Sequence, residues 1–379
     1  MSVRIAVLSL AALLLAACSG KENVREPAEL QDIASPEVQP KRAWSRGVGH
    51  GDHFSRLAVA VADDALFVVN QAGRVRALNP ENGRPVWERR TKTRAIAGPA
   101  VAADLVLFDT LDAEVIALSR ADGSERWRAK VSSEVLAAPV ASRELVIVRT
   151  VDGRLHGLAL ESGERRWTFD RGVPSLTLRG LSAPLLHGGR LFVGMDNGRV
   201  AAIDPRSGQL LWEQVIAAPT GRSELERLAD IDADIVAEGA ELYVASVGGE
   251  LACVDGETGQ VLWRRSISSY SGMVLVDDKL VVSDTDGRVW ALDARTGAAA
   301  WKQEDLLYRR LSAPALKDGL LVVGDFEGYL HWLSPRDGRL VGRVRAGDAP
   351  LQARPMPVAE RLVVYSREGR LFAVGTRSE

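Results

Sequence analysis

The side chains best suited to catalysis or metal binding are few and scattered. Five histidines occur along the chain, at His50, His53, His156, His187 and His331. The first two are three residues apart, but they lie in a glycine-rich stretch with no cysteine or helical pattern to complete a zinc site. The chain also has no Gly-x-Ser-x-Gly nucleophile turn and no Gly-x-x-x-x-Gly-Lys-Ser/Thr phosphate loop. The sequence therefore predicts no catalytic residue, no metal and no cofactor.

One cysteine does stand in a pattern with a defined chemistry. Arg4 is followed by an apolar run over residues 5–17, too short to span a bilayer, which ends in Leu-Ala-Ala before Cys18. This order resembles the acylation signal of bacterial lipoproteins, so we expect residues 1–17 to be a signal peptide and Cys18 to become a lipid-modified N-terminus bearing palmitate-like chains. The alternative is an ordinary signal peptide with a chance cysteine. By the same resemblance, Ser19 rather than an aspartate favours the outer membrane.

The composition excludes some classes of function. The formal net charge is -2, with 46% hydrophobic and 26% charged residues, which is an ordinary globular balance. Nothing suggests bulk attraction to nucleic acid. Residues 18–42 are polar, contain three prolines and hold no lasting periodicity. We interpret residues 18–42 as a flexible tether between the lipid and a folded body.

A repeat of about 40 residues fills the chain from residue 43 onward. Its units align on a turn glycine at Gly83, Gly123, Gly163, Gly208, Gly259, Gly297 and Gly338. Four residues later the units carry Trp87, Trp127, Trp167, Trp212, Trp263 and Trp301, and in the seventh unit Gly342. Each unit has short apolar runs separated by glycine turns, which predicts four antiparallel strands and hence one blade of a β-propeller.

The number of blades follows from an incomplete last unit. Seven units carry both glycine turns, and an eighth begins near Leu351 but ends before a fourth strand. Residues 43–46, which include Trp44, are unassigned and precede the first unit. We therefore predict that residues 43–379 form an all-β, eight-bladed propeller whose ring is closed by this N-terminal strand, because closure removes an exposed edge.

The repeat also indicates which residues are structural and which are not. Cys253 occupies a slot held by Ala77, Ala117 and Ala202 in other units, so we interpret it as a small buried residue; a reactive thiol is the alternative. Connections between blades are usually twelve or thirteen residues from the tryptophan to the next blade. Two neighbours are longer, seventeen from Trp167 and twenty-three from Trp212.

Strand alternation places these two long connections on one face of adjacent blades. They mix leucines with arginine and carboxylates, as a protein-binding patch does. The alternative is that the leucines fold back over the blade ends. Longer connections on one face are where propellers carry function.

Several stretches outside the generic repeat resemble the family of outer-membrane protein assembly factor BamB. They are PSLTLRG (174–180), GRSE (221–224), RLADID (227–232), DLLYRR (305–310) and GDFEGYLHW (324–332). The resemblance implies a non-catalytic scaffold lipoprotein on the periplasmic side of the outer membrane, which binds the periplasmic domains of BamA, the barrel-forming subunit, and aids insertion of β-barrel proteins. It implies partner-binding positions at Leu176, Leu178, Arg179, Asp230 and Asp232.

A second class of function also fits the repeat. The pattern Ala-x-Asp-x-x-Thr-Gly-x-x-x-Trp resembles blades of dehydrogenases that bind pyrroloquinoline quinone. Those enzymes are longer and typically carry a vicinal cysteine pair, which this chain does not have. The sequence leaves open whether unfolded outer-membrane protein clients bind directly, for example by adding a strand to an exposed edge.

Overall fold

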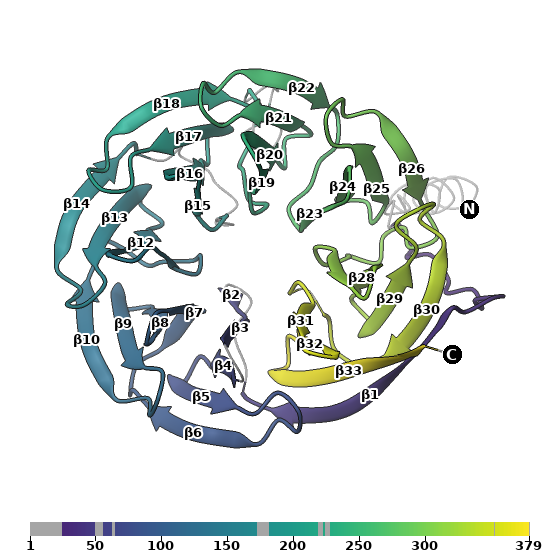
Figure 1. The fold of residues 1–379 in the computed structure, drawn as a ribbon, viewed down its shortest axis with the longest axis horizontal. Helices are drawn as coiled ribbons and strands as arrows, with labels where there is room; N and C mark the ends of the chain where they lie inside the picture. The colour runs from purple at the N-terminus through teal and green to yellow at the C-terminus, as the bar shows by residue number, and fades with distance from the viewer. Residues whose placement is uncertain are drawn as a thin grey trace, which may run out of the picture.

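The computed structural model describes residues 25–49, 56–62, 65–172, 182–218, 223, 228–351 and 353–378. The secondary structure of these residues consists of strands, with no helix. The strands form eight antiparallel sheets arranged as blades around a ring (Figure 1). No described segment folds into an apolar helix of membrane-spanning length. The predicted all-β, eight-bladed propeller is confirmed.

Each blade has four antiparallel strands, ordered from the centre of the ring outward. Blade 1 comprises β3 (Val59–Ala62), β4 (Ala65–Val69), β5 (Arg74–Leu78) and β6 (Pro85–Arg90), and blade 2 comprises β7 (Ala95–Ala102), β8 (Leu105–Thr110), β9 (Glu114–Ser119) and β10 (Glu125–Lys130). Blade 3 comprises β11 (Val140–Ala141), β12 (Leu145–Arg149), β13 (Arg154–Ala159) and β14 (Arg165–Asp170), and blade 4 comprises β15 (Leu185–His187), β16 (Arg190–Gly194), β17 (Arg199–Ile203) and β18 (Leu210–Val215). A short strand, β2 (Arg56–Leu57), pairs in parallel with β7 as a fifth member of blade 2.

Blade 5 comprises β19 (Val236–Glu238), β20 (Glu241–Ala245), β21 (Leu251–Asp255) and β22 (Val261–Arg265), and blade 6 comprises β23 (Gly272–Val276), β24 (Lys279–Ser283), β25 (Val289–Asp293) and β26 (Ala299–Gln303). Blade 7 comprises β27 (Ala315–Lys317), β28 (Leu320–Gly324), β29 (Tyr329–Leu333) and β30 (Leu340–Arg345), and blade 8 comprises β31 (Met356–Val358), β32 (Arg361–Tyr365), β33 (Arg370–Ser378) and β1 (Val38–Gly47). The second strand of each blade is almost wholly buried, as in β8, because other blades cover both of its faces. The outer strands alternate between buried and exposed residues, as in β10.

A tryptophan–glycine contact joins neighbouring blades. The indole N–H of Trp127 on β10 donates to the Leu160 carbonyl of blade 3 at 2.8 Å, and its ring lies over Gly163. A Cβ on that glycine would lie 2.5 Å from the ring, and the backbone there has a φ of 71°. Glycine is therefore required twice, by space and by conformation. The same contact recurs in the pairs Trp44–Gly83, Trp87–Gly123, Trp167–Gly208, Trp212–Gly259, Trp263–Gly297 and Trp301–Gly338.

Within a blade, each of these tryptophans is paired with a small residue on the third strand. Trp127 lies opposite Ala117, and Trp263 lies opposite Cys253, which explains the cysteine as a small core residue. Blade 7 inverts the sizes, because Trp332 on β29 lies opposite Gly342 on β30. Trp332 is fully buried. The seventh repeat therefore carries its tryptophan on the third strand of the blade instead of the fourth.

The N-terminal strand closes the ring as predicted. β1 pairs antiparallel with β33, with Trp44 opposite Ala373, and the Trp44 indole donates to the Pro80 carbonyl of blade 1 at 3.0 Å. The strand begins at Val38, earlier than the four residues read from the sequence. Blade 8 is therefore completed by residues more than 300 positions from its other three strands.

Removing β1 should destabilise the whole ring. A chain that starts at residue 50 lacks Trp44 and leaves β33 as an open edge. A chain that starts at residue 25 keeps Trp44 and the pairing of β1 with β33. The shorter chain loses the whole ladder between β1 and β33 together with the half-buried Trp44, so its melting temperature should fall well below that of the longer chain. Equal melting temperatures for the two chains would contradict closure by β1.

The exchange of sizes in blade 7 should appear as coupling between Trp332 and Gly342. Trp332→Ala should cost about 3–5 kcal/mol, and Gly342→Trp should also destabilise because a side chain at this position, which lies opposite Trp332, would meet Val38 and Pro40. In the double variant, the cavity left by the first change admits part of the second side chain. Urea unfolding of the four proteins should give a favourable coupling above about 0.5 kcal/mol. Strict additivity would show that the two positions do not share one space.

Candidate partner-binding site

One face of the ring, here called the connection face, carries both the turns between second and third strands and the connections between blades. Antiparallel pairing sends both out of the same end of a blade. In blade 6 the two touch directly, because the Tyr308 N–H in the β26–β27 connection donates 2.6 Å to the Asp286 carbonyl in the β24–β25 turn. In blade 4, the Ala217 N–H donates to the Gly198 carbonyl in the same way, at 3.0 Å.

The two long connections leave this face at blades 3 to 5. They join β14 to β15 and β18 to β19. The Ala183 N–H at the end of the first donates 2.9 Å to the Asp234 side chain at the end of the second. The structure therefore brings the ends of the two connections together. Leu176, Leu178 and Arg179, the candidate residues of the first connection, lie outside the described residues.

Asp230 and Asp232, the candidate residues of the second connection, are buried. Asp230 is 1% exposed and Asp232 is 3% exposed. The backbone around them is tied on both sides, since Ile231 N–H donates to the Met195 carbonyl at 3.2 Å and Val247 N–H donates to the Asp230 carbonyl at 3.0 Å. These two carboxylates therefore do not lie on the exposed surface of the connection. Ile231 between them is fully buried against Gly194 and draws the stretch into the space between blades 4 and 5.

A buried ion pair, which the sequence analysis did not single out, supports the first connection. Arg149 at the end of β12 donates through Nη2 to Asp196 Oδ1 at 2.6 Å, and both side chains are 4% exposed. Arg149 Nη1 has no hydrogen-bond partner among the residues that the structure describes, and Arg149 lines a cavity of about 20 Å³ with Phe169 and Arg171. That volume suits roughly one water. In the sequence, the arginine that directly follows the apolar run Val-Ile-Val indicates a charge at the buried end of a strand, and this pattern could have pointed to the ion pair.

The first connection begins at a carboxylate that stays ionised. Asp170, the last residue of β14, accepts hydrogen bonds from Arg154 Nε at 2.7 Å and from the Gly172 N–H at 3.1 Å. These two donors lower the pKa of Asp170 below its usual value. The chain therefore leaves blade 3 at a fixed position.

The described residues with possible chemical reactivity occupy structural positions. Burial raises the pKa of the Cys253 thiol to about 12, so the nucleophilic thiolate is scarce at neutral pH. Burial also lowers the pKa of His156 and of His331. Among the described residues, no three His, Cys, Asp or Glu side chains meet as a metal-ligand group would. Cys18, the candidate acylation site, and His50 and His53 lie outside the described residues.

The chain is similar over its whole length to proteins of one family. A family model described as "Outer membrane protein assembly factor BamB" matches residues 37–117 and 71–303. The protein of that name from Pseudomonas aeruginosa is 47% identical over 374 residues, covering 98% of both chains. The crystal structure of BamB from Moraxella catarrhalis superposes with a TM-score of 0.81 at 26% identity, covering 89% of this chain and 99% of that one.

A quinohemoprotein alcohol dehydrogenase from Comamonas testosteroni shares the fold, with a TM-score of 0.70 at 14% identity over 89% of this chain and 76% of that one. Identity this low shows the propeller architecture and nothing of the activity. The match to the relative from Pseudomonas aeruginosa is 47% identical and covers 98% of this chain, so it is not confined to a few blades. From the match of the family model and this full-length identity, the chain belongs to the family of outer membrane protein assembly factor BamB.

Proposed function

We propose that this chain is a non-catalytic scaffold lipoprotein that binds the periplasmic domains of BamA and aids insertion of β-barrel proteins into the outer membrane. The observation that carries the proposal is the family membership, since the full-length relatives are named as outer membrane protein assembly factors. The geometry supports it. Two adjoining connections leave one face of a closed ring, and their ends are hydrogen-bonded to each other and to blades 4 and 5. A preorganised surface loses less entropy on binding.

In this proposal the residues of the two connections have different tasks. Leu176, Leu178 and Arg179 contact the partner, with the leucines as apolar anchors and the guanidinium as a fork of donors. Asp230 and Asp232 belong to the same site, and their burial favours a role in holding the second connection in place beside the first. Arg149 and Asp196 hold the neighbouring blade ends in the same way.

The quinoprotein alternative rests on the shared fold alone. The dehydrogenases that the blade pattern resembles typically place a vicinal cysteine pair beside the quinone, and this sequence has only Cys18 and Cys253. The slots that match the blade pattern are filled by residues that pack blades together, as the Trp127–Gly163 contact shows. No observation in this chain favours dehydrogenase activity over the scaffold function.

The proposed location follows from the N-terminal segment. Residues 1–17 serve as a signal peptide and Cys18 carries the lipid. The chain after Cys18 leads to the propeller, whose first strand begins at Val38 rather than at the predicted residue 43. The Leu-Ala-Ala-Cys order supports acylation, and the assembly function of the named relatives supports the periplasmic face of the outer membrane.

Cys18→Ala should detach the chain from the membrane without unfolding it. The first strand of the ring, β1, begins at Val38, twenty positions after Cys18, so we expect the propeller to fold without the lipid. Stable anchoring takes two or more acyl chains, all of which this variant loses. Fractionation of cells lacking BamA should place the variant in the soluble periplasmic fraction, with a melting curve like that of the unlipidated wild type. Recovery of the variant with outer membranes in those cells would contradict acylation.

Truncating the proposed anchors should weaken binding to BamA periplasmic domains. Leu176→Ala and Arg179→Ala should each cost about 2 kcal/mol, roughly a thirtyfold rise in Kd. Arg179→Lys should not restore binding fully, since it keeps the charge but not the fork of donors. Val86→Ala on β6 is the control, because Val86 is an exposed apolar residue away from both connections. Titration against purified BamA domains measures this, and unchanged Kd values would move the site elsewhere.

The burial of Asp230 changes what its substitution should do. Asp230→Ala removes a carboxylate that is 1% exposed and should lower the free energy of unfolding by about 1–3 kcal/mol. Binding to BamA domains should weaken together with the melting temperature, as expected for a residue that positions the connection. Lost binding at an unchanged melting temperature would instead show that Asp230 contacts the partner itself.

A further inference from the structure

The chain before β1 is held on the outside of the propeller at Ala28. The Ala28 N–H donates 2.9 Å to the Leu307 carbonyl in the β26–β27 connection. The Ala28 carbonyl accepts from Arg309 Nη1 of the same connection at 3.0 Å. Both backbone groups of one residue are thus bonded to the connection face between blades 6 and 7.

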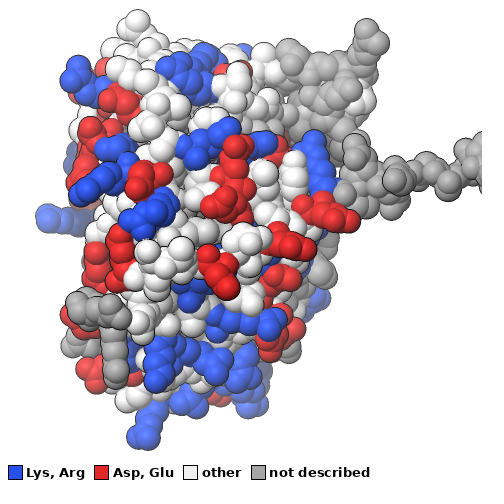
Figure 2. All heavy atoms as spheres, turned by 90° about the vertical axis from the view of Figure 1, so that its right-hand side faces the viewer, with Lys and Arg blue, Asp and Glu red and all other residues white. Residues whose placement is uncertain are grey.

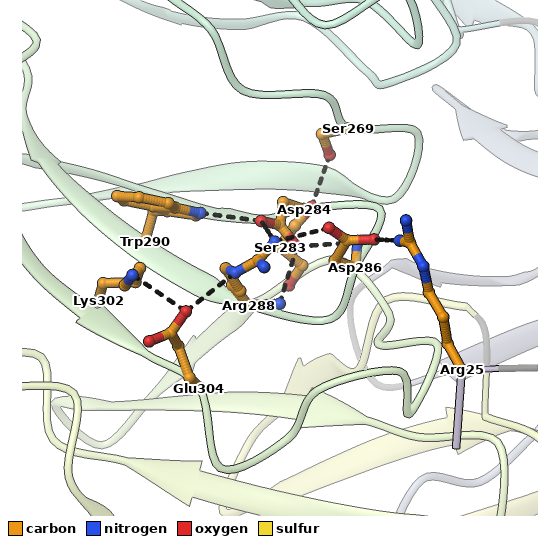
Figure 3. A network of polar contacts seen from close by, with 9 residues as sticks. All are labelled: Arg25, Ser269, Ser283, Asp284, Asp286, Arg288, Trp290, Lys302 and Glu304. Atoms are coloured by element: carbon orange, nitrogen blue, oxygen red, sulfur yellow. Dashed lines mark hydrogen bonds and ion pairs between the residues drawn. The ribbon is translucent and has the colours of Figure 1, made fainter. Parts of the chain in front are cut away.

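Arg25 adds a side-chain contact at the same place (Figure 3). Its Nη1 donates 2.6 Å to Asp286 in the β24–β25 turn, and its guanidinium lies 5.5 Å from the centre of the Tyr308 ring. Asp286 also accepts from Arg288 Nη1 at 2.7 Å, so its carboxylate is already fixed. The ion pair is exposed and adds little energy by itself. It marks where the segment meets the connection face.

From Ala28 the segment crosses the outer side of blade 7 and reaches the opposite face, where β1 begins. Figure 1 shows this purple chain beside β30. Arg343 Nη1 on β30 donates 2.9 Å to the Gln31 carbonyl, and the Glu37 N–H donates 2.8 Å to the Val341 carbonyl. Leu30 packs against the apolar cluster of blades 6 and 7. We call residues 25–37 the docked segment.

Val341 on β30 lies at the point where the docked segment continues into β1. Val341 is fully buried and packs in a cluster with Val38. Val86 and Leu262 stand at the same point of the repeat in blades 1 and 5 and are 64% and 48% exposed. The outer strand of blade 7 is therefore covered by chain where others face solvent.

A buried charge network supports both arginines that hold the docked segment. Asp325 Oδ2 accepts from Arg309 Nε at 2.8 Å and lies 3.0 Å from His331 Nε2. Arg343 Nε donates to His331 Nδ1 at 3.2 Å, so this histidine is neutral with its proton on Nε2. Arg309, Asp325 and His331 are buried. The network fixes two guanidinium groups, and each donates outward to a carbonyl of the docked segment.

The docked segment limits how far the lipid can lie from the ring. Cys18 and Arg25 are seven positions apart, and a fully extended chain of that length spans at most about 25 Å. Had the chain been free up to β1, the twenty positions from Cys18 to Val38 would have allowed nearly three times that reach. Docking therefore fixes both the length and the point of departure of the anchor.

We propose that the docked segment turns the sector of blades 6 and 7 on the connection face toward the membrane surface, with the lipid headgroups as its neighbour. The proposal rests on the acylation of Cys18 proposed above. Figure 2 shows basic and acidic side chains interspersed over much of the flank that carries this sector, so this flank has no broad patch of one sign that would set the orientation. The tether provides it. The long connections of blades 3 to 5 then lie on the membrane-directed face.

Energy transfer to a labelled membrane tests this orientation. The full chain, expressed in bacterial cells with its N-terminal segment and extracted in detergent, is placed in vesicles of phosphatidylethanolamine and phosphatidylglycerol that contain an acceptor on the headgroup. Donors are attached at Asp305→Cys on blade 6, Asp112→Cys across the ring on blade 2, and Arg336→Cys on the opposite face of blade 7, three exposed positions. Cys253 is buried and does not compete for label. Transfer should be greatest at residue 305. Equal transfer at all three, or more at 112 or 336, would overturn the proposal.

Two variants of the segment separate docking from tether length. Ala28→Pro removes the N–H that bonds to Leu307 without touching the ring, so the difference between the three donor positions should shrink. Ala34→Pro is the matched control at an exposed position of the same segment and should keep the wild-type order. If Ala28→Pro melts like the wild type and energy transfer at the three donor positions keeps the wild-type order and differences, docking does not orient the ring.

The same experiment distinguishes this proposal from the one it rests on. If the wild-type chain does not sediment with the vesicles, acylation of Cys18 is refuted and the orientation falls with it. If the chain sediments but the three positions give equal transfer, the lipoprotein proposal stands and the orientation alone is refuted.

Discussion

The structure depends on the contact between a tryptophan on one blade and a turn glycine on the next. Blades of a propeller touch only their neighbours, so the ring is as strong as its junctions. Each indole supplies a large apolar area and one hydrogen bond, such as that from Trp167 to the Pro205 carbonyl at 3.0 Å. The glycine beneath it, Gly208, has a φ of 72° and no room for a Cβ. One residue type on each side thus fixes both the distance and the angle between blades.

The junction from blade 7 to blade 8 is the exception, and its difference is tied to closure. Gly342 stands where the tryptophan would be, and a Cβ there would lie 2.6 Å from Val38 at the start of β1. A tryptophan at this point would occupy the place through which the N-terminal strand enters blade 8. The bulk lost from β30 is restored by Trp332 on β29. The departure from the repeat is therefore where a strand from the other end of the chain must fit.

The sequence predicted the features that repeat and missed those that occur once. The spacing of glycines and tryptophans predicted the blades, and the unassigned Trp44 predicted closure. The docked segment was not predicted, because Ala28 meets Arg309 across 281 positions and no periodic pattern marks such a contact. The burial of Asp230 and Asp232 was also missed, since polar residues in a long connection indicate solvent unless a neighbour such as Ile231 draws them inward. The proposed contacts of Leu176, Leu178 and Arg179 remain predictions.

The buried charges of the connection face fit a positioning function better than a stabilising one. Arg149–Asp196 and Arg309–Asp325 both join an arginine to a carboxylate that follows a second strand, where the apolar core ends. Removing two charges from water costs about as much as their attraction returns, so such pairs add little stability. They do fix geometry: the first sits under the start of a long connection, and the second holds the chain that leads to β1. The hydrogen bonds at Ala28 and Gln31 lie between the lipid-bearing end of the chain and β1. A pull on the N-terminal segment would therefore load these two bonds before it loads the strand that closes the ring.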